Sequence, residues 1–293
     1  MKVVEGYMPY LGYKTYYRIV GECKGNKKPL VLLHGGPGST HNYFEVLDKL
    51  ADEGRAIIFY DQIGCGNSYV EGHPELWNAK TWIDELKALR EHLGLDEIHL
   101  LGQSWGGMLL LDYVCNHKPE GLKSLVLSST LPASWMWGIE GHRMIEELPK
   151  EMQEAIEKAT TTGDYSDPAY QAAEDEYMLR HCSGALTEDS PECLRRPKKS
   201  GRESYVVGWG TNEFTPTGTL KDYDVTEQLK DIKEPTLVIN GGNDLCTPYI
   251  AKYMYDRIPN SQWELFRTCR HMCFVEENEK YCNLLNEWME KHD

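Results

Sequence analysis

The chain of 293 residues contains no apolar run that approaches the roughly 20 residues needed for a transmembrane helix. Its first six residues also lack the long apolar core of a secretory signal peptide. We therefore expect a cytoplasmic protein that has no membrane as a partner.

Basic residues are scarce. The sequence has 31 lysines and arginines against 46 aspartates and glutamates, which gives a formal net charge of −15. Proteins that bind nucleic acid present an excess of positive charge to the phosphates. The acidic balance therefore argues against nucleic acid as a partner.

Cysteines are few, and their number is odd. The nine cysteines include no CxxC pair, which favours reduced thiols over a disulfide framework. Cys269 and Cys273 flank His271 at a spacing of four, but no second pair completes a metal site. The phosphate-binding patterns GxxxxGK[ST] and GxGxxG are also missing. We expect neither a metal nor a cofactor.

The most informative motif surrounds Ser104. The run Gly102–Gly107 follows the apolar residues Ile98–Leu101 and precedes the helix-compatible segment Met108–Val114. This pattern is typical of the nucleophile elbow, a sharp strand-to-helix turn that holds a serine in a strained conformation at the tip of a sheet. The alternative is an ordinary β-turn with a buried serine.

A nucleophilic serine needs a base, and the base needs a group that orients it. Residues Pro235–Asn240 predict a buried strand, and Asp244 follows it. Residues Gln262–Phe266 predict the last strand, and His271 follows that strand. The order serine, acid, histidine is that of the α/β-hydrolase triad. We therefore predict that Ser104, Asp244 and His271 are the catalytic residues.

A second glycine-rich run, His34–Gly38, follows the predicted strand Leu30–Leu33. Acyl transfer places negative charge on a carbonyl oxygen, and two backbone N–H groups must point at it. One donor is predicted to be the N–H of Trp105, directly after the nucleophile, and the other the N–H of Gly36. These two residues form the predicted oxyanion hole.

The three runs His34–Gly38, Asp61–Ser68 and Gly102–Gly107 together resemble the proline iminopeptidases. Members of that family are α/β-hydrolases that remove N-terminal proline, and often other residues, from short peptides. The resemblance extends over nearly the whole chain. It implies a serine aminopeptidase that works through an acyl-enzyme on short peptides with a free N-terminus.

The resemblance also implies one residue for substrate binding. In the family, a glutamate in an Asn-Glu-Phe run binds the free α-amino group, and here that residue is Glu213. Some members carry a second glutamate directly after the triad aspartate, where this chain has Leu245. This departure leaves room for an amino-acid amidase or a carboxylesterase that uses the same triad. A non-enzymatic binding protein of the same fold is a further alternative.

The pattern of strands and helices predicts an α/β fold. Strands alternate with helices across residues 15–130 and 236–291, which predicts a mostly parallel sheet with helices on both faces. Between them lie helix-compatible stretches broken at Gly163, Pro168 and Pro191. We predict an α/β-hydrolase core of residues 1–130 and 229–293, with an inserted, mainly helical cap of residues 131–228. Residues 132–228 hold 19 acidic and 10 basic side chains, and this net charge of −9 should favour cationic substrates.

Two groups of cap and loop residues are candidates for contact with ligands. Aromatic residues of the cap are candidates for packing on a pyrrolidine ring: Trp135, Trp137, Tyr205, Trp209 and Phe214. Three cysteines lie near the predicted acid and base in sequence: Cys246, Cys269 and Cys273. A bulky adduct on one of these thiols would displace the base or its orienter, so we expect thiol reagents to inhibit through them.

Overall fold

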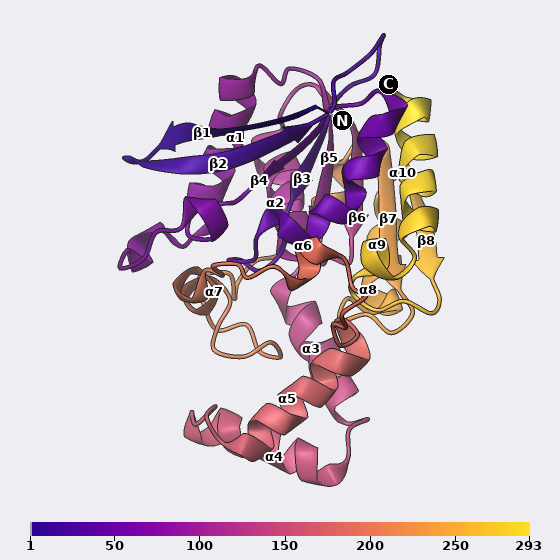
Figure 1. Ribbon diagram of the computed structural model, residues 1–293. Coiled ribbons are helices and arrows are strands. Elements are labelled where there is room, and N and C mark those ends of the chain that lie inside the picture. The colour runs from indigo at the N-terminus through magenta and orange to yellow at the C-terminus, as the bar shows by residue number, and fades with distance from the viewer. Residues whose placement is uncertain (1) are drawn as a thin grey trace.

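An eight-stranded sheet organises the computed structural model, which describes residues 2–293 and leaves Met1 outside (Figure 1). The strands lie in the order β1-β2-β4-β3-β5-β6-β7-β8. In chain order they are β1 (Val3–Tyr10), β2 (Tyr13–Val20), β3 (Leu30–Leu33), β4 (Ile57–Tyr60), β5 (Ile98–Gln103), β6 (Leu122–Ser128), β7 (Thr236–Gly241) and β8 (Ser261–Phe266). Strands β1 and β2 are antiparallel to their neighbours, and all the other pairs are parallel. The predicted mostly parallel sheet of an α/β-hydrolase is confirmed.

Helices cover both faces of this sheet. Helices α1 (Ala79–Leu93), α2 (Trp105–Asp112) and α8 (Pro248–Tyr255) share one apolar core with Val31 and Leu33 of β3. Helices η1 (His41–Glu53), α9 (Cys273–Glu276) and α10 (Asn278–His292) share the other core with Leu30 and Leu32 of the same strand. Successive strand residues point to opposite faces, so a strand that is buried on both sides becomes a continuous apolar run.

Five α-helices and one short 3-10 helix lie between β6 and β7: α3 (Ser134–Ile145), α4 (Lys150–Thr162), α5 (Pro168–His181), α6 (Glu192–Arg195), α7 (Arg202–Gly208) and η5 (Leu229–Asp231). Gly163 ends α4 with a positive φ of 74°, and Pro168 is the first residue of α5. We call residues 131–228 the cap segment. Its helices α3, α4 and α5 extend beyond the end of the sheet that lies opposite the two chain termini (Figure 1). Within residues 2–293, no helix is both long and apolar enough to cross a membrane.

Candidate active site

Ser104 occupies a sharp turn between β5 and α2, with φ 56° and ψ −125°. A Cβ atom on Gly102 would lie 2.2 Å from the carbonyl oxygen of Gly106, and one on Gly106 would lie 2.0 Å from that of Leu33. Both positions therefore require glycine, because the backbone of neighbouring elements passes too close for a side chain. The turn is held from β6 by a hydrogen bond from the Ser104 N–H to the Ser128 carbonyl (3.0 Å).

Asp244 and His271 are brought together at the same edge of the sheet. The Nδ1 atom of His271 lies 2.6 Å from Oδ1 of Asp244, whose side chain is buried. Three further groups donate to this carboxylate: the Ser129 hydroxyl (2.6 Å), the Gly241 N–H (3.0 Å) and the Cys246 N–H (2.8 Å). A carboxylate with this many hydrogen-bond donors is fixed in place and can orient the His271 ring. Sequence reasoning missed Ser129, although it lies directly after β6, the neighbour of β7.

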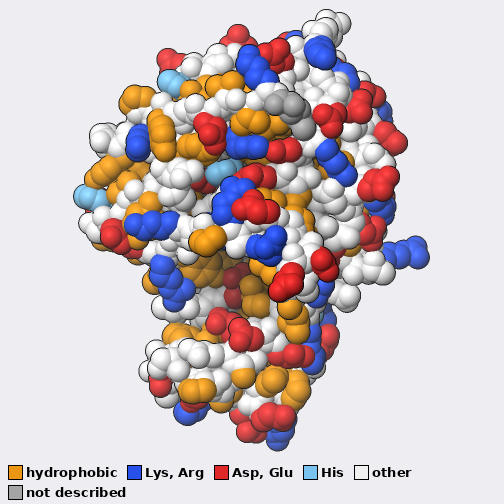
Figure 2. All heavy atoms as spheres, in the orientation of Figure 1, with side chains coloured by type: hydrophobic (Ala, Val, Ile, Leu, Met, Phe, Trp, Pro, Cys, Tyr) orange, Lys and Arg blue, Asp and Glu red, His pale blue; other side chains and the backbone are white. Residues whose placement is uncertain are grey.

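Ser104 and His271 line one cavity of about 400 Å³. Figure 2 shows the surface hollowed between the helices of the cap segment and the sheet-containing part of the molecule. The structure shows no hydrogen bond from the Ser104 hydroxyl to His271, and such catalytic bonds often tighten only in the substrate complex. The backbone N–H of His271 donates to the backbone carbonyl of His181 at the end of α5 (3.1 Å). This bond connects the loop that carries His271 to the cap segment.

The predicted oxyanion donors lie on either side of Ser104, the predicted nucleophile. Gly36 has φ 119°, and a Cβ atom there would lie 2.5 Å from the Gly38 nitrogen, so only glycine fits. Gly36 lines the cavity with Ser104, and Trp105 is the first residue of α2. Among the described residues, neither the Gly36 N–H nor the Trp105 N–H has a hydrogen-bond partner. Two free backbone donors next to a serine can accept a developing negative charge.

One buried amide connects the loops that carry these donors. The Gln62 side chain donates to the His34 carbonyl (2.9 Å) and accepts from the indole N–H of Trp105 (2.8 Å). The Gln62 backbone N–H donates to Nε2 of His34 (3.0 Å). Burial lowers the pKa of His34 to about 4, so its ring is neutral at pH 7 and its Nε2 can accept. The Asp61–Ser68 run therefore braces the site.

A possible set of metal ligands lies behind the same loop. Ligand atoms of His34, Asp61 and Cys65 lie within 4.8 Å of one another. Their lone pairs and protons are already engaged, however: Nε2 of His34 accepts from Gln62, and Asp61 accepts from Nδ1 of His41 at 2.7 Å. The Cys65 thiol donates to the Gln62 carbonyl (3.2 Å). These contacts assign the cluster to loop structure.

Glu213 lies in the cap segment and lines the cavity with Ser104 and His271. The Tyr205 hydroxyl donates to Oε2 of Glu213 (2.6 Å), and sequence reasoning gave this tyrosine no such role. The indole N–H groups of Trp137 (2.8 Å) and Trp209 (3.3 Å) donate to the Glu213 carbonyl. Burial raises the pKa of Glu213, against the opposing effects of the Tyr205 hydrogen bond and of His271. A carboxylate held in this way is ready to pair with a cation.

A smaller pocket opens from the same point. It is lined by Gly36, Ser104, Trp105, Met108, Leu131, Trp137, Trp209 and Glu213. Of the five cap aromatics considered from the sequence, Trp137 and Trp209 line this pocket and Tyr205 lines the larger cavity. Trp135 is 46% exposed, and Phe214 packs on Tyr177 with 4.7 Å between ring centroids. Leu245, at the position of the second glutamate of some relatives, lines the larger cavity.

The expectation for the three cysteines is corrected by the structure. Cys246, Cys269 and Cys273 are at most 1% exposed, and burial raises the pKa of Cys246 well above its usual value. The Cys246 thiol also donates to the Thr130 carbonyl (2.6 Å). These three cysteines are close in sequence to Asp244 and His271, but their thiols are not accessible to a reagent in the cavity. Among the described residues, the cysteine that lines the cavity is Cys182, directly after α5. Burial raises the pKa of this thiol as well, to about 12, so access to the cavity rather than acidity distinguishes it from Cys246.

Comparisons with known proteins agree with this geometry. The family model for the alpha/beta hydrolase fold matches residues 28–278. The fold and the site thus define a serine hydrolase of the α/β-hydrolase class. Proline iminopeptidases from Clostridium botulinum (strain Hall) and Clostridioides difficile (strain 630) are 67% and 64% identical to the chain, in each case over 100% of both sequences. The chain belongs to the proline iminopeptidase family.

A solved structure supports the same assignment. The crystal structure of the proline iminopeptidase from Mycobacterium smegmatis has a TM-score of 0.87 to this protein at 30% sequence identity. The match covers 99% of this chain and 98% of that one. The cap segment therefore lies within the aligned part.

Proposed function

We propose that the protein is a prolyl aminopeptidase, a serine peptidase that releases N-terminal proline from short peptides. One observation carries the proposal: a single cavity joins Ser104 and His271 to the carboxylate of Glu213. A carboxylate beside the nucleophile suits a substrate whose charged amine lies next to the scissile bond. The names of the curated relatives, which share up to 67% identity with this chain, support the same activity.

The reaction follows from the positions of the triad. Ser104 Oγ attacks the carbonyl carbon, and Nε2 of His271 takes the hydroxyl proton while Asp244 holds the opposite ring nitrogen. The N–H groups of Gly36 and Trp105 stabilise the oxyanion, and losing one such donor typically costs roughly 2.7–4 kcal/mol. His271 then protonates the leaving amine as the C–N bond breaks. Water, activated by the same histidine, hydrolyses the acyl-enzyme.

Selection of the N-terminal residue falls to the cap segment. Glu213 pairs with the protonated amine, and the indoles of Trp137 and Trp209 provide an apolar wall for a pyrrolidine ring. A longer N-terminal extension would have to pass through this wall. Buried polar groups that require a partner reject ligands that lack it, so a blocked amine should be a poor substrate.

Two further assignments belong to the same proposal. Residues 131–228 act as a cap on a core of residues 1–130 and 229–293, because the cap segment supplies Glu213 while the core supplies the triad. The location is cytoplasmic, which is in keeping with nine free cysteines.

The deciding experiment compares three chromogenic substrates: proline p-nitroanilide, N-acetylproline p-nitroanilide and p-nitrophenyl acetate. We expect efficient cleavage of the first and loss of about two orders of magnitude or more in kcat/KM on N-acetylation, because the ammonium is gone. Ser104→Ala should abolish turnover of proline p-nitroanilide with the fold intact. Comparable rates on the free and acetylated anilides, or a clear preference for the acetate ester, would instead favour an amidase or a carboxylesterase.

A further inference from the structure

The larger cavity extends beyond the space needed for an N-terminal residue. It shares Gly36, Ser104 and Glu213 with the small pocket that the two tryptophans line. The nucleophile therefore lies where the two spaces meet. The small pocket has a volume of only about 10 Å³, so an N-terminal proline beside Glu213 would occupy the near part of the larger cavity of about 400 Å³. The rest of that cavity is left for the part of the peptide that follows the scissile bond.

The larger cavity carries two basic side chains, Lys198 and Arg202, in an otherwise acidic protein. No carboxylate of residues 2–293 lies within 4.0 Å of either charged group. Burial lowers the pKa of Lys198, and only the Cys193 thiol opposes that effect, since no carboxylate contributes. The next residue, Lys199, is different: its ammonium lies 3.4 Å from the ring centroid of Tyr69. The side chains of Lys198 and Arg202 are both exposed, so their charged groups are accessible, and a cation without a carboxylate partner is suited to binding an anion.

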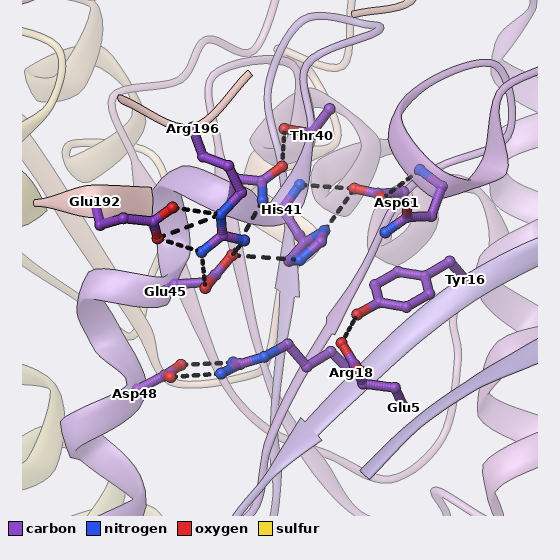
Figure 3. Close-up of polar contacts among 12 residues, drawn as sticks. Glu5, Tyr16, Arg18, Thr40, His41, Glu45, Asp48, Asp61, Glu192 and Arg196 are labelled. Carbon is purple, nitrogen blue, oxygen red and sulfur yellow. Dashed lines mark hydrogen bonds and ion pairs between the residues drawn. The ribbon is translucent and has the colours of Figure 1, made fainter. Parts of the chain in front are cut away.

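The backbone around Lys198 is held at points on both sides. Arg196, two residues earlier, donates to both oxygens of Glu45 on η1 (3.0 and 3.1 Å), as Figure 3 shows. The Lys199 carbonyl accepts from the Gly66 N–H (2.7 Å), and the Gly201 N–H donates to the Gly38 carbonyl (2.7 Å). The backbone that carries Lys198 therefore has little freedom left to lose on binding, and the remaining cost is that of ordering the lysine side chain.

Glu45, the anchor of Arg196, is itself part of a buried network. Its Oε1 lies 3.6 Å from Nε2 of His41, and Nδ1 of His41 lies 2.7 Å from Asp61 (Figure 3). Asp61 begins the run that braces the oxyanion loops. The segment that carries Lys198 is thus anchored on the part of the molecule that forms the active site.

We propose that Lys198, with Arg202, binds the C-terminal carboxylate of the substrate, so that dipeptides and tripeptides are preferred over longer peptides. The inference rests on the proposed aminopeptidase function. The Lys198 ammonium lies 6.0 Å from the ring centroid of Tyr43, whose hydroxyl accepts from the Gly35 N–H (2.5 Å). In a dipeptide or tripeptide the carboxylate lies one or two residues beyond the scissile bond. One residue spans at most roughly 3.6 Å, so this carboxylate stays close to Ser104, in the cavity that Lys198 and Arg202 line. A longer peptide would present a neutral amide to the same cations.

The test compares prolylglycine with prolylglycinamide, which differ only in the terminal charge. The release of proline is measured for the parent and for Lys198→Met, Arg202→Met and the matched control Lys199→Met. We expect the parent to prefer prolylglycine by about tenfold or more, the strength of a charge-assisted hydrogen bond. Lys198→Met should remove most of that preference, Arg202→Met part of it and Lys199→Met none. Proline p-nitroanilide, which has no carboxylate, is the reference substrate, and the loss of each variant on prolylglycine is taken relative to its own rate on the anilide. Lys199→Met should stay within about twofold of the parent on the anilide.

The anilide separates the two proposals. A parent enzyme that fails to cleave proline p-nitroanilide would overturn the aminopeptidase function itself. If the parent cleaves the anilide but treats the dipeptide and its amide alike, the carboxylate site is overturned. The same conclusion holds if Lys198→Met keeps the preference, or if Lys199→Met loses as much of it as Lys198→Met, which would indicate a diffuse effect of positive charge.

Discussion

Replacing Glu213 with glutamine tests the role of its charge at nearly constant volume. In the structure the carboxylate accepts a hydrogen bond from Tyr205 (2.6 Å) and lines the cavity that contains Ser104. Removing one partner of a buried, hydrogen-bonded ion pair typically costs about 2–5 kcal/mol. Each 1.36 kcal/mol is a factor of ten in rate, so kcat/KM should fall roughly 30-fold to several thousand-fold for a substrate with a free amine.

The assay compares proline p-nitroanilide with p-nitrophenyl acetate, which has no ammonium group. Glu213→Gln should lose activity on the anilide and leave the acetate rate nearly unchanged. Tyr205→Phe is the matched control, because it deletes the hydrogen bond to the carboxylate but keeps the charge. Its loss on the anilide should be smaller, near the roughly 1.5–3 kcal/mol of a hydrogen bond to a charged group.

An equal loss on both substrates would refute this reasoning. Glu213 also accepts two indole hydrogen bonds through its backbone carbonyl, from Trp137 and Trp209. A variant that shifted this loop would disturb the whole site, and the acetate rate would report that disturbance. Only a selective loss on the amine substrate assigns the effect to the charge.

Three further changes test other parts of the structure. Gly106→Ala places a Cβ atom 2.0 Å from the Leu33 carbonyl oxygen. In urea denaturation it should lower the free energy of unfolding by about 3 kcal/mol or more. Gly163→Ala is the control, because the space around that position is open, and it should cost about 1 kcal/mol. A mercurial should inhibit the parent and spare a Cys182→Ser variant, while Cys246→Ser should remain as sensitive as the parent. Burial raises the pKa of Glu85 to about 8, so the folded state retains a proton that the unfolded chain releases near its ordinary value of 4.5. Stability should therefore fall as the pH rises from 4.5 through 8, and Tm measurements on Glu85→Gln should show a flatter profile.

The parts of the fold that could be predicted from the sequence are those in which local pattern and burial agree. Strand β3 matches the predicted Leu30–Leu33, and β7 and β8 lie within one residue of prediction at each end, because each is a short apolar or β-branched run between turns. Strand β1 was not expected. Most of its residues are exposed at the edge of the sheet, so they carry no apolar alternation that would reveal a strand.

In the site, too, the residues that follow a recognisable strand could be predicted from the sequence, and the residues that hold them in place could not. Ser104, Asp244 and His271 each follow a predicted strand, and parallel strands place their carboxyl ends at one edge of the sheet. The groups that hold them come from elsewhere in the chain, such as Ser129, whose hydroxyl donates to Asp244. Cys182 reaches the cavity only because α5 packs above it. No local pattern encodes such contacts, which depend on how the cap segment is seated.

The net charge of a segment is a poor guide to the charge that a substrate meets. Residues 132–228 carry a net charge of −9, which suggested a preference for cations. Many of those acids, including Glu151, Glu154 and Glu157 of α4, are exposed to solvent, where charges are screened over about 8 Å at physiological salt. The cavity itself is lined by one carboxylate, that of Glu213, and, besides His271, by the basic side chains of Lys198 and Arg202. Charges of both signs in one cavity of about 400 Å³ suit a zwitterion of limited length, which a short peptide with two free ends provides.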